Sequence, residues 1–434
     1  MSANPIVEPI SLAQTHRVWA GIGWRSFGGP SAQIALMHRV LVEEHGWLSE
    51  DEFIHALGFC MLLPGPEAMQ LATYAGWKRH GVAGGLVAGL WFVLPGAFVV
   101  GMLAGIYARF GQLPWMLAAF AGVQATVLVL VVEAMQRIAK RALKGPRSVL
   151  IALGSLAALG LLGVPYPLVV LAAGVMGAFG EPLSSDAVAP VVARARLGGT
   201  IRTVLAWLAI WMLPLAAVAL AFGPTHILTQ LGAFFSRLAV VTFGGAYAVL
   251  GYMSQDVVAR HGWLTARQML DGLGLAETTP GPLILVTEFV GFVAAYRAFP
   301  AQAFGMGLWG AGVALWATFA PCFLWIFAGA PYLEALRREP RLRGALHGIT
   351  AAVLGVMLSL ALWFALHVWF GATTTFAWGP LHATLPVLAS LSPRMVGLTL
   401  LSAVLLLRAR WSAPRVIALT ALVALLLERA TAPR

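Results

Sequence analysis

Two short phrases of glycine and proline interrupt apolar stretches of this sequence, and each phrase occurs twice. Phe27-Gly28-Gly29 returns at 243–245, and Pro64-Gly65-Pro66 returns at 280–282. Proline removes a helical N–H donor, and glycine admits backbone angles that other residues avoid. Each phrase is therefore expected to break a helix and to start a new one. The first amides of a helix, at the positive end of its dipole, can bind an anion.

The residues beside these breaks are the candidate ligands of an anion. Ser31 and Gln33 follow the first FGG phrase and could donate hydrogen bonds to an oxyanion, or could simply cap the helix. Arg25 lies in an apolar run, where an arginine either binds a ligand or extends toward the membrane surface. A packing kink explains one such phrase equally well, but four breaks in register favour a binding site. The predicted binding residues are Arg25, Gly28, Gly29, Ser31, Gln33, Gly65, Gly244, Gly245, Thr279 and Gly281.

Three acidic residues flank the PGP phrases, namely Glu67, Glu277 and Glu288. Near a helix start, a carboxylate either stabilises the helix dipole or carries a proton, because burial favours its neutral form. We treat the three as candidates for proton coupling. The sequence shows no nucleophile–base triad, nucleotide-binding loop or metal-ligand spacing. We therefore expect no catalytic residues, no cofactor and no metal, and an ATP-driven pump is disfavoured.

The elements that carry these residues are expected to be membrane helices. Of 434 residues, 60% are hydrophobic and only 10% are charged, against roughly 25% charged in soluble domains. Long stretches without Asp, Glu, Lys or Arg, such as 80–108 and 344–393, each hold at least one span of about 20 residues. The composition predicts an all-α polytopic membrane protein in contact with lipid. The net charge of +11 fits basic loops on the cytoplasmic side rather than a nucleic-acid partner.

The chain contains an internal duplication. Residues 27–66 align with 243–282 without a gap, and 15 of these 40 positions are identical; further on, the offset becomes +226. The loop after the helix at Gly122 is rich in Lys and Arg, whereas its counterpart near 363–373 has none. Equivalent loops should thus lie on opposite sides, as in transporters built from inverted repeats.

This pattern predicts about 13 transmembrane segments with broken helices. We divide the chain into a first repeat (1–180), a linker with one inverting helix (181–222) and a second repeat (223–434). The amino terminus is then cytoplasmic and the carboxyl terminus periplasmic. A homodimer is compatible with the sequence but not required by it.

The ordered, duplicated phrases FGG, HGW and PGP resemble the chromate transporter (CHR) family in its long bidomain form. The resemblance covers nearly the whole chain. It implies a bacterial inner-membrane protein that exports chromate, driven by the proton gradient, and so gives chromate resistance. Sulfate or another tetrahedral oxyanion is the alternative cargo, because it shares the charge and shape of chromate. A membrane-embedded enzyme or a scaffold is the alternative class.

Overall fold

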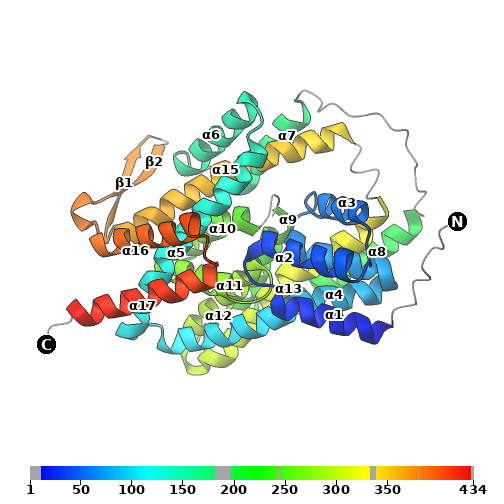
Figure 1. Ribbon diagram of the computed structural model, residues 1–434, viewed down its shortest axis with the longest axis horizontal. Helices are drawn as coiled ribbons and strands as arrows, with labels where there is room; N and C mark the ends of the chain where they lie inside the picture. Colours follow the sequence, from blue (N-terminus) through cyan, green and yellow to red (C-terminus); the bar gives the residue numbers. More distant parts are fainter. Residues whose placement is uncertain are drawn as a thin grey trace.

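The computed structural model of the chain describes residues 11–180, 197–241, 243, 246–332, 339–379 and 381–431 (Figure 1). Apolar stretches of the first half form helices, interrupted where glycine and proline were expected to break them. These helices are α1 (Leu12–Arg25), α2 (Gly29–His38), α3 (Glu50–Cys60), α4 (Glu67–Phe110), α5 (Pro114–Ala142), α6 (Pro146–Gly160) and α7 (Tyr166–Ala178).

The second half begins after α8 (Leu197–Phe222), the helix that the sequence assigns to the connection. The proposed linker lies mostly at 181–196, outside the described residues. The helices that follow are α9 (Ile227–Val241), α10 (Ala246–Gln255), α11 (Ala266–Thr278), α12 (Val286–Ala298), α13 (Ala303–Gly329), α15 (Pro340–Trp369), α16 (Pro393–Ala403) and α17 (Ala413–Thr431).

The duplicated stretch folds the same way twice. In the first unit, α2 continues into a π-helical stretch (Arg39–Glu44) and turns into α3. In the second unit, α10 continues into a π-helical stretch (Asp256–Arg260) and turns into α11. Ser49 caps α3 and Thr265 caps α11 in the same manner, each in a reciprocal capping box. We call residues 29–60 the first unit and residues 246–278 the second unit.

Both PGP phrases end a helix as expected. Gly65 and Gly281 have φ angles of 119° and 87°, which residues with a Cβ rarely adopt. The chain then enters a new helix at Glu67 in the first half, and at a short turn, Leu283–Leu285, in the second. Each unit is therefore separated from the helix that follows it by a rigid, non-helical corner.

Helix α4 folds back on itself. His80 and Gly81 have non-helical angles, and a Cβ on Gly76 would lie 2.8 Å from the carbonyl carbon of Gly84. Residues 67–79 and 82–110 are thus two antiparallel helices in close contact, made possible by small residues. The second half has the same arrangement in α12 and α13, where a Cβ on Gly291 would lie 3.0 Å from the carbonyl carbon of Gly310.

The two halves exchange their short helices. α6 and α7 pack on α15, whereas α16 and α17 pack on α5 (Figure 1). A Cβ on Gly122 of α5 would overlap the carbonyl oxygen of Thr420, and a Cβ on Gly348 of α15 would overlap that of Ala173. The two contacts are equivalent, because in each case the short helices of one half pack on the long helix of the other half. We call α5–α7 and α15–α17 together the exchange bundle.

Five helices are long and apolar enough to cross a membrane, and three shorter apolar helices accompany them in the described part of the chain. The protein is thus a helical, multi-pass membrane protein, while the number of 13 segments and the inversion of the halves stay predictions. The all-α expectation missed one element, a hairpin of β1 (Thr373–Trp378) and β2 (Leu381–Pro386). Its threonine-rich first strand favours extended backbone, and Gly379 (φ 58°) begins its turn.

Candidate functional site at the helix breaks

The second PGP corner meets the first FGG break. The amide of Gly281 donates a hydrogen bond to the carbonyl oxygen of Ser26 at 2.9 Å. The side chain of Gln33 donates from Nε2 to the carbonyl oxygens of Gly281 (2.6 Å) and Ser26 (3.3 Å). Gln33 is 1% exposed, so these bonds are shielded from solvent. Gln33 therefore fastens two breaks from opposite halves of the chain.

At this junction, helix α4 has no room for a side chain at the point of contact. A Cβ on Gly96 of α4 would overlap the carbonyl oxygen of Pro280. Gly96 follows Pro95, a proline inside α4. At the first PGP corner, a Cβ on Gly65 would lie 3.1 Å from Cys322 Sγ. Cys322 follows Pro321 of α13 just as Gly96 follows Pro95.

These two contacts are reciprocal. Each PGP corner packs against the residue after the helical proline of the other half. Contacts that repeat with exchanged partners are what a two-fold relation between two bodies produces. At the first corner, Gln70 Nε2 also donates to the carbonyl oxygen of Pro64 at 2.7 Å. Each corner is thus held by a glutamine, although Gln33 and Gln70 are not equivalent in the repeat.

The start of α2 has no side-chain cap. Helix α2 begins at Gly29 after Gly28, whose φ is 87°, and Pro30 lies in its first turn. The first amides of a helix have no intrahelical acceptor. Phe27 is 43% exposed, and Gly28 and Ser31 are also exposed, so this helix start can be reached from outside the fold.

Other predicted ligands are placed differently. Arg25 is exposed and its Nε donates to Gly21 of the same helix at 2.8 Å. Thr279 is 3% exposed and its hydroxyl donates to Ala276 at 3.1 Å, which closes the end of α11. In this conformation the Gly281 amide is engaged by Ser26. Gly244 and Gly245 lie outside the described residues.

The three acidic candidates are separated by their burial. Glu67 is half-buried in the first turn of α4, and Glu277 is 6% exposed at the end of α11. Glu288 of α12 is 4% exposed. Among the described residues, its Oε2 atom has no hydrogen-bond partner. An unpaired buried carboxyl group is costly when ionised, which makes its proton the natural compensation.

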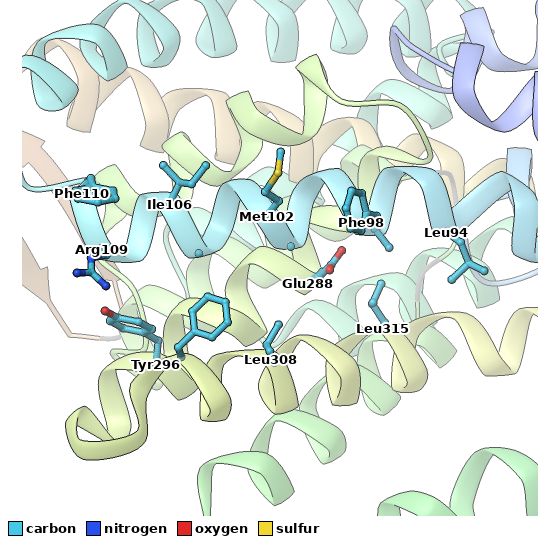
Figure 2. A pocket seen from close by; sticks show the side chains of 14 residues that line it. Leu94, Phe98, Met102, Ile106, Arg109, Phe110, Glu288, Tyr296, Leu308 and Leu315 are labelled. Carbon is cyan, nitrogen blue, oxygen red and sulfur yellow. The ribbon is translucent and has the colours of Figure 1, made fainter.

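Glu288 lies in a groove of about 860 Å³ between α4 and α13. Figure 2 shows its carboxyl group about midway along the groove, with Arg109 and Tyr296 near one end and Leu94 and Leu315 toward the other. The lining is otherwise apolar; it comprises Leu94, Ala97, Phe98, Gly101, Met102, Gly105, Ile106, Arg109, Phe110, Glu288, Tyr296, Phe304, Leu308 and Leu315.

One buried polar cluster escaped the sequence analysis. Asp271 of α11 is 2% exposed and accepts hydrogen bonds from the Tyr107 hydroxyl (2.7 Å) and from Gln124 Nε2 (2.8 Å). It therefore connects α11 of the second half to α4 and α5 of the first. The available signal was an aspartate on the apolar face of an expected membrane helix. Asp271 is nine residues from the second PGP phrase, so it was not among the acids that flank these phrases.

In the described part of the chain, no group of three or more His, Cys, Asp or Glu side chains lies close enough together to hold a metal ion. Both cysteines, Cys60 and Cys322, are free and buried.

Long apolar helices, two structurally related halves and broken helices meeting in the interior define a class, the membrane transporters built from repeats. The chain belongs to the chromate transporter family, whose sequence profile matches residues 13–178 and, separately, residues 229–426. The chain is 33% identical over 360 residues to the chromate transport protein of Pseudomonas aeruginosa, covering 82% of each chain.

It is also 30% identical over 348 residues to the chromate transport protein of Cupriavidus metallidurans, covering 80% of this chain and 81% of the relative. Its relatives are thus named as transport proteins rather than enzymes. No solved structure is similar to this chain.

Proposed function

We propose that this protein exports chromate from the cytoplasm across the inner membrane in exchange for protons, and so confers chromate resistance. The observation that carries the proposal is the junction of Ser26, Gln33 and Gly281, where breaks from opposite halves meet beside a helix start. A transport site at such a crossing is available to both sides in turn when the halves move. Family membership supplies the cargo.

The anion is bound by the start of α2 in this proposal. Chromate carries two negative charges on a tetrahedron of oxygens, which suits the amides after Gly28 and the hydroxyl of Ser31. Gly29, Gly65, Gly244, Gly245 and Thr279 complete the binding set. Arg25, now bonded to its own helix, would supply a positive charge if its side chain turned toward the break.

Protons are carried by Glu288 in this proposal, with Glu67 and Glu277 as the other candidates. The carboxyl group of Glu288 lies in a groove, and among the described residues its Oε2 atom has no hydrogen-bond partner. A neutral carboxyl group is stable there, and an ionised one is costly. Release of the proton on one side and its recovery on the other would therefore couple the carboxyl group to a conformational change.

The first test is transport in inverted membrane vesicles, whose outer face is the former cytoplasmic face. Vesicles that contain the protein should accumulate labelled chromate when a proton gradient is imposed, and a protonophore should abolish the accumulation. Uptake equal to that of vesicles lacking the protein would contradict chromate export. Uptake that resists the protonophore would contradict proton coupling.

Sulfate is the second candidate cargo, because backbone amides distinguish poorly between tetrahedral dianions. A competition assay in the same vesicles separates the two cargoes. If chromate is the cargo, unlabelled sulfate should inhibit labelled chromate uptake only at much higher concentration than unlabelled chromate does. Equal inhibition, together with uptake of labelled sulfate, would favour a general oxyanion carrier.

The topology is also proposed, with about 13 segments, inverted halves, a cytoplasmic amino terminus and a periplasmic carboxyl terminus. Single cysteines placed at Ser11 and at Thr431 test it in intact cells. An impermeant maleimide should label only the second. Labelling of both from the same side would overturn the odd number of segments.

A further inference from the structure

The two units have the same internal structure but different surroundings. In the second unit, one face of α11 is buried; it consists of Leu270, Asp271, Gly274 and Glu277. Gly274 packs on α5, where a Cβ would overlap Val123 and lie 3.2 Å from Val127. Together with the Asp271–Gln124 hydrogen bond, this contact docks the second unit onto the exchange bundle.

The equivalent face of the first unit is uncovered. At the same positions, 216 residues earlier, α3 carries Ile54, His55 and Gly58, and Met61 caps its end. Ile54 is 53% and Met61 46% exposed, and His55 is exposed as well. Among the described residues, no atom lies within 4 Å of a Cβ built on Gly58. The face that α11 buries is therefore open in α3.

Helices α10 and α2, which precede α11 and α3 in the two units, also differ in burial: α10 is covered by the exchange bundle and α2 is not. A Cβ on Gly251 of α10 would lie 2.8 Å from Val356 of α15, and Gly251 is buried. Its counterpart in α2, Ala35, is exposed. The exchange bundle thus lies against the second unit and away from the first. Figure 1 shows α10 and α11 in the middle of the molecule, among the helices of that bundle, and α3 toward its right-hand side.

The repeat identifies the surface that α3 would fit. Val123 and Gln124 of α5, which receive α11, correspond to Ile349 and Thr350 of α15 at the offset of +226. Both residues are only half-buried in this structure. The halves repeat two contacts with exchanged partners, one at Gly122 and Gly348 and one at the PGP corners. The α11–α5 contact should therefore also have an exchanged version.

We propose that α15 carries a docking site for α3, centred on Ile349 and Thr350, which α3 occupies in a second conformation. In that conformation the exchange bundle leaves α11, the hydrogen bond from Gln124 to Asp271 breaks, and Gly58 approaches Ile349. The helix start at α2, which is exposed now, is covered in that conformation. This inference rests on the proposed function in one respect, because alternating access supplies the reason for the movement.

Paired cysteines test the proposal in native membranes, in a background with Cys60→Ala and Cys322→Ala. The Cβ of Gly274 would lie 3.5 Å from the Cβ of Val123, within the range for a disulfide. Val123→Cys/Gly274→Cys should therefore cross-link and report the present conformation. Gly58→Cys/Ile349→Cys is the equivalent pair and should cross-link in the second conformation. Gly58→Cys/Val123→Cys is the control that neither conformation brings together.

We expect both equivalent pairs to cross-link on mild oxidation and the control pair not to. Adding Asp271→Asn should raise the cross-linked fraction of the Gly58/Ile349 pair, because it weakens the α11 contact. If the Gly58/Ile349 pair stays at the control level, with and without Asp271→Asn, while Val123/Gly274 cross-links, the proposal is wrong and the face of α3 contacts lipid.

The cross-links are read without any anion, so their outcome is separate from that of the transport assay. Should the Gly58/Ile349 disulfide form, it should also abolish chromate uptake until dithiothreitol restores it. If both pairs cross-link in a protein that does not transport chromate, the second conformation is supported and the proposed cargo is contradicted.

Discussion

Gln33 connects breaks that lie 248 residues apart, through the hydrogen bond from its amide to the Gly281 carbonyl. A buried carbonyl that loses its donor costs about 1–3 kcal/mol. We predict that Gln33→Leu, which preserves size, strongly reduces chromate uptake while the protein still reaches the membrane. Uptake per amount of purified protein in vesicles is the measurement. Gln230→Leu is the matched control, since the side chain of Gln230 donates a hydrogen bond to the carbonyl oxygen of nearby Thr225 at the surface. Full activity of the Gln33 variant would show that the junction is not needed.

Glu288 allows proton coupling to be separated from anion binding. Glu288→Gln keeps the shape of the side chain but cannot release a proton. We expect this variant to lose gradient-driven chromate accumulation and to retain exchange of labelled for unlabelled chromate. Both quantities can be measured in the same vesicles.

Glu428→Gln provides the comparison, because Glu428 is an exposed acid paired with Arg394 near the end of the chain. If Glu288→Gln accumulates chromate with the same dependence on the gradient, the proton must be carried elsewhere, with Glu67 and Glu277 as the remaining candidates.

At the scale of the elements, small residues determine how closely the halves approach. Gly96→Ala would place a methyl group onto the Pro280 carbonyl, and overpacking of this kind costs about 1–3 kcal/mol. We predict a lower unfolding temperature in detergent and loss of transport. Gly312→Ala in α13 is the matched control, because nothing lies within 4 Å of its Cβ and alanine favours the helix. Equal unfolding temperatures for the two variants would contradict the tight contact.

Some of the elements could be predicted from the sequence, and others could not. The units and the PGP corners were predictable, because glycine and proline act on their own backbone wherever they stand. The family resemblance was confirmed by the match to both halves. The FGG break was found at Gly28, but the engagement of the Gly281 amide by Ser26 was not foreseen, since it joins segments far apart in the chain.

The hairpin of β1 and β2 and the role of Asp271 were missed for a related reason. The hairpin occupies a stretch that hydropathy alone reads as a helix connection. The role of Asp271 depends on its hydrogen bonds with Tyr107 and Gln124, which lie on two other helices. The exchange of short helices cannot be predicted from hydrophobic periodicity either. An apolar face indicates that a helix is covered, but it does not identify the helix that covers it.

At the scale of the whole molecule, the exchange makes each half dependent on the other. We predict that residues 1–188 and residues 189–434, made as separate chains in one cell, assemble and transport chromate. Either chain alone should be degraded, because α6 and α7, or α16 and α17, then lack the helix they cover. Co-purification through a tag on one chain, followed by the vesicle assay, provides the measurement. A stable, well-folded first half on its own would contradict the interlocked packing.

The same interlock has a consequence for the order of events during synthesis. α7 ends at Ala178, but the helix it packs on begins only at Pro340. At ~5–20 residues per second, the ribosome needs about eight to thirty seconds to cover that distance. During this time α6 and α7 lack the helix on which they pack, so we expect the insertion machinery of the membrane to cover their exposed faces until α15 is made.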